Sequence, residues 1–185
     1  MNTSNQPTLG TLIVKTSVVH TVTYFVMGIL ALTVLNYTEA FATGPLGSFM
    51  RPTDSAWVAA GPMFQPIRGL IFALAFYPLR EIFFNRKNGW LILWWVLVAL
   101  GILSTFGAAP GSVEGIIYTI VPVTITSYVE VVPQAFLLSW ILFYWVNHPE
   151  KKWISWVLGI FFVLIILMSA LGVMAATGMI QVPAA

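Results

Sequence analysis

The sequence contains no cysteine and very little charge. Its 185 residues include no Cys, eight Lys or Arg and six Asp or Glu. The absence of Cys excludes a disulfide-stapled fold, a thiolate metal site and a cysteine nucleophile. Soluble domains carry about 25% charged residues, whereas this chain carries 8%. So few charges cannot cover the surface of a water-soluble enzyme, and disordered chains, which are rich in charge, are excluded as well.

Apolar residues are what the sequence has in excess. They make up 59% of the chain, and the mean hydropathy is +0.91. A helix that crosses a bilayer needs about 20 mostly apolar residues, and five segments approach or exceed that length. These segments are residues 11–36, 59–84, 90–106, 115–146 and 153–177. We therefore predict an all-α integral membrane helical bundle, a single transmembrane domain over residues 1–185 with five transmembrane helices.

Basic residues are distributed unequally between the two ends of the predicted helices. Five crossings place six of them on one side: Lys15, Arg80, Arg86, Lys87, Lys151 and Lys152. The opposite side holds Arg51. Because cytoplasmic loops are enriched in Lys and Arg, we expect the N-terminus in the cytoplasm and the C-terminus outside. The expected location is a membrane crossed several times, the bacterial inner (plasma) membrane, and the first segment is too long for a cleaved signal peptide.

The predicted outer loop at residues 37–58 combines turn-forming and apolar residues. Gly44-Pro45 marks a turn, while apolar side chains such as Phe49 favour contact with the membrane surface or with the helix ends. The loop is therefore either an ordinary interfacial connector, which is the interpretation we favour, or a lid over the bundle.

The expected partners follow from the same distribution of residues. Seven of the eight Trp residues lie toward the predicted cytoplasmic ends of the helices, where Trp anchors a protein in the headgroup layer. Basic residues at helix ends meet anionic membrane lipids, so the net charge of +2 does not indicate nucleic acid. The sequence shows no internal repeat of the kind from which many transporters build their pathway, and five helices cannot be divided into two equal halves. We therefore expect a homo-oligomer or a membrane-protein partner.

Three of the five predicted helices carry polar residues on one face when side chains are placed at 100° per residue. On the first helix the face is Thr16, Ser17, His20, Thr23, Tyr24, Gly28 and Ala31. On the second it is Gln65, Arg68, Gly69, Ala73 and Arg80. On the fourth it is Thr119, Thr126, Ser127, Glu130, Pro133, Gln134 and Tyr144. This pattern predicts that helices one, two and four face one another, with three and five against lipid.

Two charged residues, Arg68 and Glu130, have no role in setting the topology. Helix rise places Arg68 about 13 Å and Glu130 about 20 Å below the outer boundary. A charge at the bilayer centre costs about 2.5–3.5 kcal/mol, and pairing the two would relieve that cost. The candidate cavity or ligand-binding residues are therefore Arg68, Glu130, Gln65, Gln134, His20 and Tyr24.

Three functions fit these residues, and the favoured one is a transporter or channel for a small molecule or ion. In it Arg68 recognises an anionic group or gates the pathway, and Glu130 binds a cation or proton. The first alternative is a non-catalytic membrane subunit or assembly factor in which the Arg68–Glu130 pair is structural. The last is an intramembrane enzyme acting on a lipid or quinone, for which the sequence offers no catalytic motif.

We expect no cofactor and no metal. The two histidines, His20 and His148, invite a haem interpretation, but helix rise puts them at different depths. One haem within one chain could not reach both. His20 is better explained as part of a polar network or as a satisfied core residue.

Overall fold

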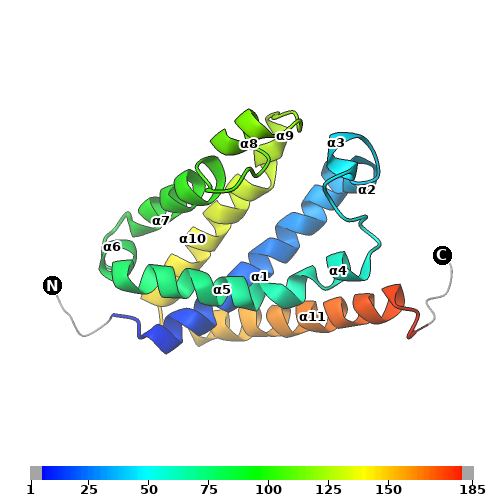
Figure 1. The fold of residues 1–185 in the computed structure, drawn as a ribbon. Coiled ribbons are helices and arrows are strands. Elements are labelled where there is room, and N and C mark those ends of the chain that lie inside the picture. Colours follow the sequence, from blue (N-terminus) through cyan, green and yellow to red (C-terminus); the bar gives the residue numbers. More distant parts are fainter. Residues whose placement is uncertain (1–5, 181–185) are drawn as a thin grey trace.

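The computed structural model describes residues 6–180, and this part of the chain is all helical, without a strand. The all-α prediction is confirmed. The main helices, shown in Figure 1, are α1 (Leu9–Val34), α5 (Gly61–Phe76), α7 (Gly89–Val98), α10 (Val131–Asn147) and α11 (Lys152–Ala176). The shorter ones are α2 (Tyr37–Ala40), α3 (Gly44–Gly47), α4 (Ala56–Ala59), α6 (Arg80–Phe84), α8 (Val113–Tyr118) and α9 (Thr126–Val129).

Among residues 6–180, three helices are long and apolar enough to cross a membrane: Leu9–Val34, Thr126–Asn147 and Lys152–Ala176. The prediction of five such helices is wrong in this respect. The second predicted span is divided, because α5 has 16 residues and passes at Tyr77–Leu79 into a 3₁₀ turn. Pro78 causes this change, since proline lacks the N–H that an α-helix needs. The third is α7, whose 10 residues continue into the π turn Ala99–Leu103.

The fourth predicted span begins later than expected. Helix α8 ends at Tyr118, and regular helix resumes only at Thr126. The residues between them are Thr119, Ile120, Val121, Pro122, Val123, Thr124 and Ile125. Proline and β-branched residues both disfavour helix. As a result Glu130 lies about one turn inside the span rather than about 20 Å deep.

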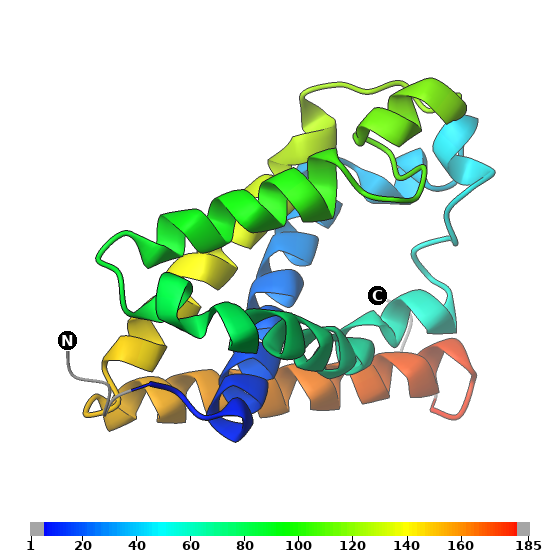
Figure 2. The ribbon, with the colours of Figure 1, turned by 60° about the vertical axis from the view of Figure 1, so that its left-hand side comes forward.

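Helix α1 is the centre of the fold. It contacts α5, α10 and α11, while α7 lies along α10 and α4 lies against α11. Figures 1 and 2 show α5 and α11 running side by side, with α7 and α10 together rising away from them. Helices α5 and α10 both contact α1 but make little contact with each other. The three polar helices therefore meet through α1 and do not enclose a common centre.

The close approach of α1 and α5 depends on a glycine. A Cβ atom built on Gly69 would lie 2.3 Å from the Cα atom of Ser17. The Ser17 Oγ atom donates a hydrogen bond of 3.1 Å to the carbonyl of Pro66. Small residues permit such contact between helix backbones in membrane proteins. The face of α5 that includes Gln65 and Gly69 is thereby held against α1.

Two side-chain contacts connect α10 to its neighbours. Lys15 of α1 donates from Nζ to the Trp145 carbonyl at 2.7 Å, in the last turn of α10. The Trp145 indole Nε1 donates to Ser155 Oγ of α11 at 3.0 Å. Trp145 is buried, with 5% of its surface exposed, so it belongs to the core rather than to the headgroup layer. Trp153 and Trp156, by contrast, are exposed.

The helix ends that carry most basic residues gather at one end of the molecule. The starts of α1 and α11, the end of α10 and all of α6 lie together at the left of Figure 1. A hydrogen bond of 2.9 Å from Gln6 Nε2 to Glu81 Oε1 joins the segment before α1 to α6. The helices and turns that carry the six basic residues assigned to one side by the sequence thus lie toward the same end of the fold.

Candidate functional site

A buried histidine lies at the contact between α1 and α5. His20 has 2% of its surface exposed. Its ring meets the ring of Phe72 edge-on, with 5.0 Å between centroids, and lies 6.4 Å from the ring of Tyr24. Among residues 6–180, neither ring nitrogen of His20 has a hydrogen-bond partner. A buried imidazole without partners is costly, because each polar atom has lost its hydration.

Two further buried side chains share this feature. Gln65 faces His20, but the two side chains do not reach hydrogen-bond geometry. The Gln65 Nε2 atom donates to the Gly61 carbonyl at 3.0 Å, while Oε1 has no partner in the described chain. The Oγ1 atom of Thr16, one helical turn before His20, is also unpartnered there. We call Thr16, His20 and Gln65 the His20 group. Together they leave four buried polar atoms without a hydrogen-bond partner in the described chain, where buried polar atoms are normally paired.

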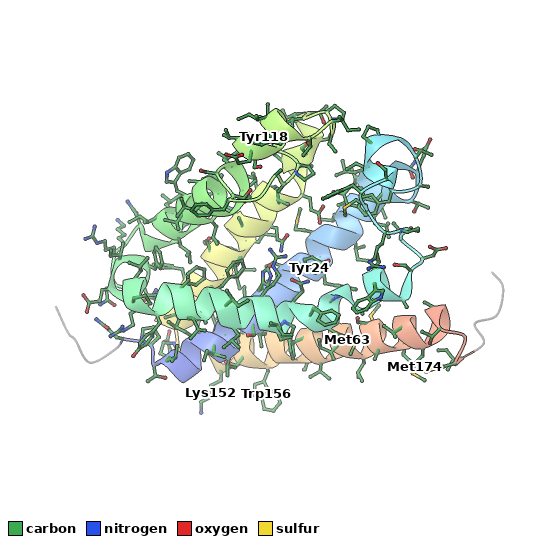
Figure 3. The ribbon with its side chains drawn as sticks, in the orientation of Figure 1. Tyr24, Met63, Tyr118, Lys152, Trp156 and Met174 are labelled. Carbon is green, nitrogen blue, oxygen red and sulfur yellow. The ribbon has the colours of Figure 1, made fainter. Side chains whose placement is uncertain are left out.

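Arg68 and Tyr24 lie at the edge of the His20 group. The Arg68 guanidinium is exposed and sits 5.8 Å from the centroid of the Phe72 ring. It is within electrostatic range of both His20 and Tyr24. Figure 3 places Tyr24 near the middle of the molecule, and its hydroxyl lies against Gly61, since a Cβ atom there would be 3.2 Å from it. A fixed positive charge therefore stands beside the buried polar atoms.

Glu130 belongs to a second contact, between α10 and the segment that follows α1. The Tyr37 hydroxyl donates a hydrogen bond of 2.5 Å to the Glu130 Oε2 atom. Tyr37 is brought there by Asn36, which adopts the left-handed conformation (φ 48°) that Asn tolerates better than most residues. Burial, and then the hydrogen bond to the carboxylate, raise the pKa of Tyr37. The tyrosine consequently remains a donor.

The expected Arg68–Glu130 pair is replaced by these two separate contacts. In the described chain, the contact of the Arg68 guanidinium is with Phe72 and the hydrogen bond of Glu130 is with Tyr37. The late start of α10 puts Glu130 near the end of its helix, and α5 contacts α1 rather than α10. Gln134 is half-buried and lies one helical turn after Glu130 on α10, so it belongs to the same region as Glu130. Tyr24 is within electrostatic range of both charges.

Two residues that form these contacts, Thr16 and Tyr37, were not among the predicted site residues. Thr16 was recognised as part of the polar face of α1, and its spacing of four from His20 was the available signal. Tyr37 lies in a loop, where no periodicity indicates which way a side chain points. Its partnership with Glu130 spans 93 positions in the sequence and depends on the tertiary fold.

Two hollows of the molecule lie away from Arg68 and Glu130. One, of about 280 Å³, lies between the loop at Pro45, Ser48 and Phe49 and the segment before α9. The other, of about 420 Å³, is an apolar groove between α10 and α11. The predicted cavity touching both charged residues is thus neither of these two. The first hollow does show that the loop at residues 37–58 folds against another connection.

Comparisons with models of protein families, with curated proteins and with solved structures gave no match. No activity can therefore be carried over from a relative. The arrangement of the chain's own residues is the basis for inferring what it does.

Proposed function

We propose that this chain is a multi-pass membrane protein that transports a small polar molecule or ion, with the His20 group as its binding position. The observation that carries the proposal is the set of four buried polar atoms on Thr16, His20 and Gln65 that have no partner in the described chain. Each would cost about 1–3 kcal/mol if left unsatisfied. In a purely structural helix pair these unpaired atoms only reduce stability. In a binding site they are available to form hydrogen bonds with the bound molecule.

The surrounding residues have defined roles in this proposal. Arg68 attracts an anionic group or an electronegative atom toward the His20 group, because its guanidinium is charged at every physiological pH. Tyr24 offers a hydroxyl next to it. The Tyr37–Glu130 contact holds the loop at residues 37–58 to α10, and so controls access from the predicted outer side. Intramembrane ionisable residues most often serve such pathways.

We also propose the orientation that the sequence indicates, with a cytoplasmic N-terminus and an external C-terminus, in a bacterial inner membrane. The clustering of basic residues at one end of the fold supports this orientation. The alternative of a structural membrane subunit is distinguished by the flux test below.

A homo-oligomer is part of the proposal. Arg68 is exposed on α5 between the exposed apolar residues Ile67 and Ile71. A charged group facing lipid alone is costly, and a second copy that offers hydrogen-bond acceptors to the guanidinium would lower that cost. Because the chain has no Cys, a single Ile71→Cys substitution would report on this contact by disulfide crosslinking in membranes. Crosslinked dimers are expected, and their absence together with a monomer mass in detergent would contradict the oligomer.

Flux through reconstituted protein tests the transport proposal. Liposomes containing the protein would be assayed with three probes: protons, chloride, and urea as a neutral solute. We expect at least one probe to cross faster than in protein-free liposomes, and His20→Phe to abolish that flux because it removes two of the unpartnered atoms. The matched control is Ser139→Ala, since Ser139 is equally buried but bonded to the Ala135 carbonyl at 2.8 Å.

The structural alternative makes the opposite prediction for the same variant. If the His20 group only holds α1 to α5, replacing unpaired polar atoms with an apolar ring raises the thermal midpoint, and no probe crosses in the native protein or in the variant. That result would leave a non-catalytic subunit as the better description.

A further inference from the structure

The groove between α10 and α11 has the shape and chemistry of a hydrocarbon-binding site. Its volume is about 420 Å³. The residues that line it are Trp140, Ile141, Tyr144, Trp153, Ile154, Val157 and Leu158. Trp140 and Trp153 are half or more exposed, so the groove is open at the surface of the bundle. Its walls therefore offer apolar and aromatic contacts along most of its length.

A cation is fixed at one end of this groove. The Lys151 Nζ atom lies 4.8 Å from the centroid of the Tyr144 ring and donates a hydrogen bond to the Tyr144 hydroxyl. His148 stacks on the same ring at 4.1 Å between centroids. Tyr144 is thus both a wall of the groove and the residue that positions Lys151. Glu150, the acidic residue of this turn, is exposed.

We propose that this groove binds a phospholipid with an anionic headgroup, with an acyl chain along the groove and the phosphate at Lys151. Charge complementarity supports this occupant. The groove lies beside the turn that carries Lys151 and Lys152, and in the proposed orientation this turn faces the cytoplasmic leaflet, where anionic lipids are concentrated. Tyr, Trp and Lys together are also the residues that meet the headgroup layer. The site is separate from the His20 group and does not depend on the transport proposal.

A second copy of the chain is a poorer occupant. A two-fold contact brings the same patch of both copies together, and would place two Lys151 side chains near each other. Like charges in such a contact oppose association. An anionic headgroup neutralises Lys151, and a flexible acyl chain fills an open apolar groove without requiring a complementary protein surface.

Lipid titration followed by native mass spectrometry tests the site. The probes are phosphatidylglycerol and phosphatidylcholine with identical acyl chains, added to the full chain in detergent. Both lipids carry the phosphate, but the choline cation of phosphatidylcholine neutralises its headgroup, so we expect phosphatidylglycerol to bind about tenfold more tightly beside Lys151. Lys151→Gln should abolish this preference by weakening phosphatidylglycerol binding much more than phosphatidylcholine binding.

The neighbouring residue supplies the matched control. Lys152 is exposed, and Figure 3 shows it beside Trp156, pointing away from the bundle. Lys152→Gln removes the same charge from the same turn and should preserve the preference for phosphatidylglycerol. If both variants lose it equally, the attraction is a general surface charge and the site is wrong. Equal binding of the two lipids by the native protein would also overturn the proposal.

A variant within the groove tests whether an acyl chain occupies it. Val157→Trp places a larger side chain in the groove at a position that is 42% exposed, so the fold can accommodate it. Binding of both lipids should fall, with the thermal midpoint retained. Unchanged binding would contradict an acyl chain in the groove, and formation of a dimer that Val157→Trp disrupts would show that a second copy occupies it.

Discussion

The Tyr37 hydroxyl donates a hydrogen bond of 2.5 Å to the Glu130 carboxylate, and so joins the segment after α1 to the start of α10. This contact uses one of the two charged residues that the sequence leaves without a topological role. Tyr37 is therefore the partner of Glu130, a role that the sequence analysis assigned to Arg68. The loop at residues 37–58 is therefore attached to the bundle at a carboxylate, and this attachment can be tested directly.

Tyr37→Phe should destabilise the protein, because it leaves the half-buried Glu130 carboxylate without its donor. The expected loss is about 1.5–3 kcal/mol, the value of a hydrogen bond to a charged group. Thermal unfolding in detergent measures it, and Tyr118→Phe is the matched control, since Tyr118 is 73% exposed. In a double-mutant cycle, Tyr37→Phe should cost much less in a Glu130→Gln background. Independent, additive effects would contradict the contact.

The same hydrogen bond predicts how Tyr37 responds to alkaline pH. Burial and the carboxylate raise the pKa of Tyr37 above the ordinary value of 10.0. A group whose pKa is raised on folding contributes stability that is present below its unfolded pKa and is lost as the pH rises through the folded value. Ultraviolet titration should therefore show that Tyr37 does not ionise near pH 10, so Tyr37→Phe should leave the amplitude there unchanged. A decrease in that amplitude would contradict the raised pKa.

Gly69→Ala should separate α1 from α5. The added Cβ atom would lie 2.3 Å from the Ser17 Cα atom, and backbone cannot move aside as a side chain can. We expect a loss of about 1–3 kcal/mol, as for other overpacked contacts, measured by thermal unfolding. Gly28→Ala on α1 is the control, because a Cβ atom there meets nothing within 4 Å. That substitution should be neutral or stabilising, since Ala favours helix.

Lys15→Met should weaken the junction of α1 with α10. It removes the hydrogen bond of 2.7 Å to the Trp145 carbonyl and the contact of Nζ with the Trp145 ring, 5.2 Å from its centroid. The positive charge also stabilises the carbonyl end of α10. A loss of about 1.5–3 kcal/mol is expected, and tryptophan fluorescence should change because Trp145 moves. Lys87→Met, at an exposed position, should change neither measurement.

Periodicity predicted several of the buried positions on α1 and α5, although Arg68, which it placed on the same face of α5, is exposed. Gln65, Gly69 and Ala73 are spaced by four residues, and all three are buried on α5. On α1, Thr16, His20 and Thr23 are likewise buried. These assignments succeed because the orientation of a side chain on a regular helix is a local property, determined by 3.6 residues per turn.

The depth of Glu130 and its partner could not be predicted in the same way. A hydropathy window does not distinguish an apolar helix from the apolar, β-branched segment before Thr126, so the span was drawn too long. The local signals are Pro122 and its β-branched neighbours, which disfavour helix but do not by themselves indicate where regular helix resumes. Once α10 begins near Glu130, the carboxylate is within reach of Tyr37, and no pattern in the sequence relates those two positions.

The sequence by itself determined that this chain is helical and apolar, that its basic residues favour one end, and that polar atoms lie on one face of α1 and of α5. These properties depend on composition and on spacing along a helix. The tertiary structure decided which three helices are long enough to span a membrane, placed α1 against both α5 and α10, and gave Arg68 and Glu130 separate surroundings. Those results depend on contacts between distant segments, where a single glycine at residue 69 or a proline at residue 122 changes which side chains can meet.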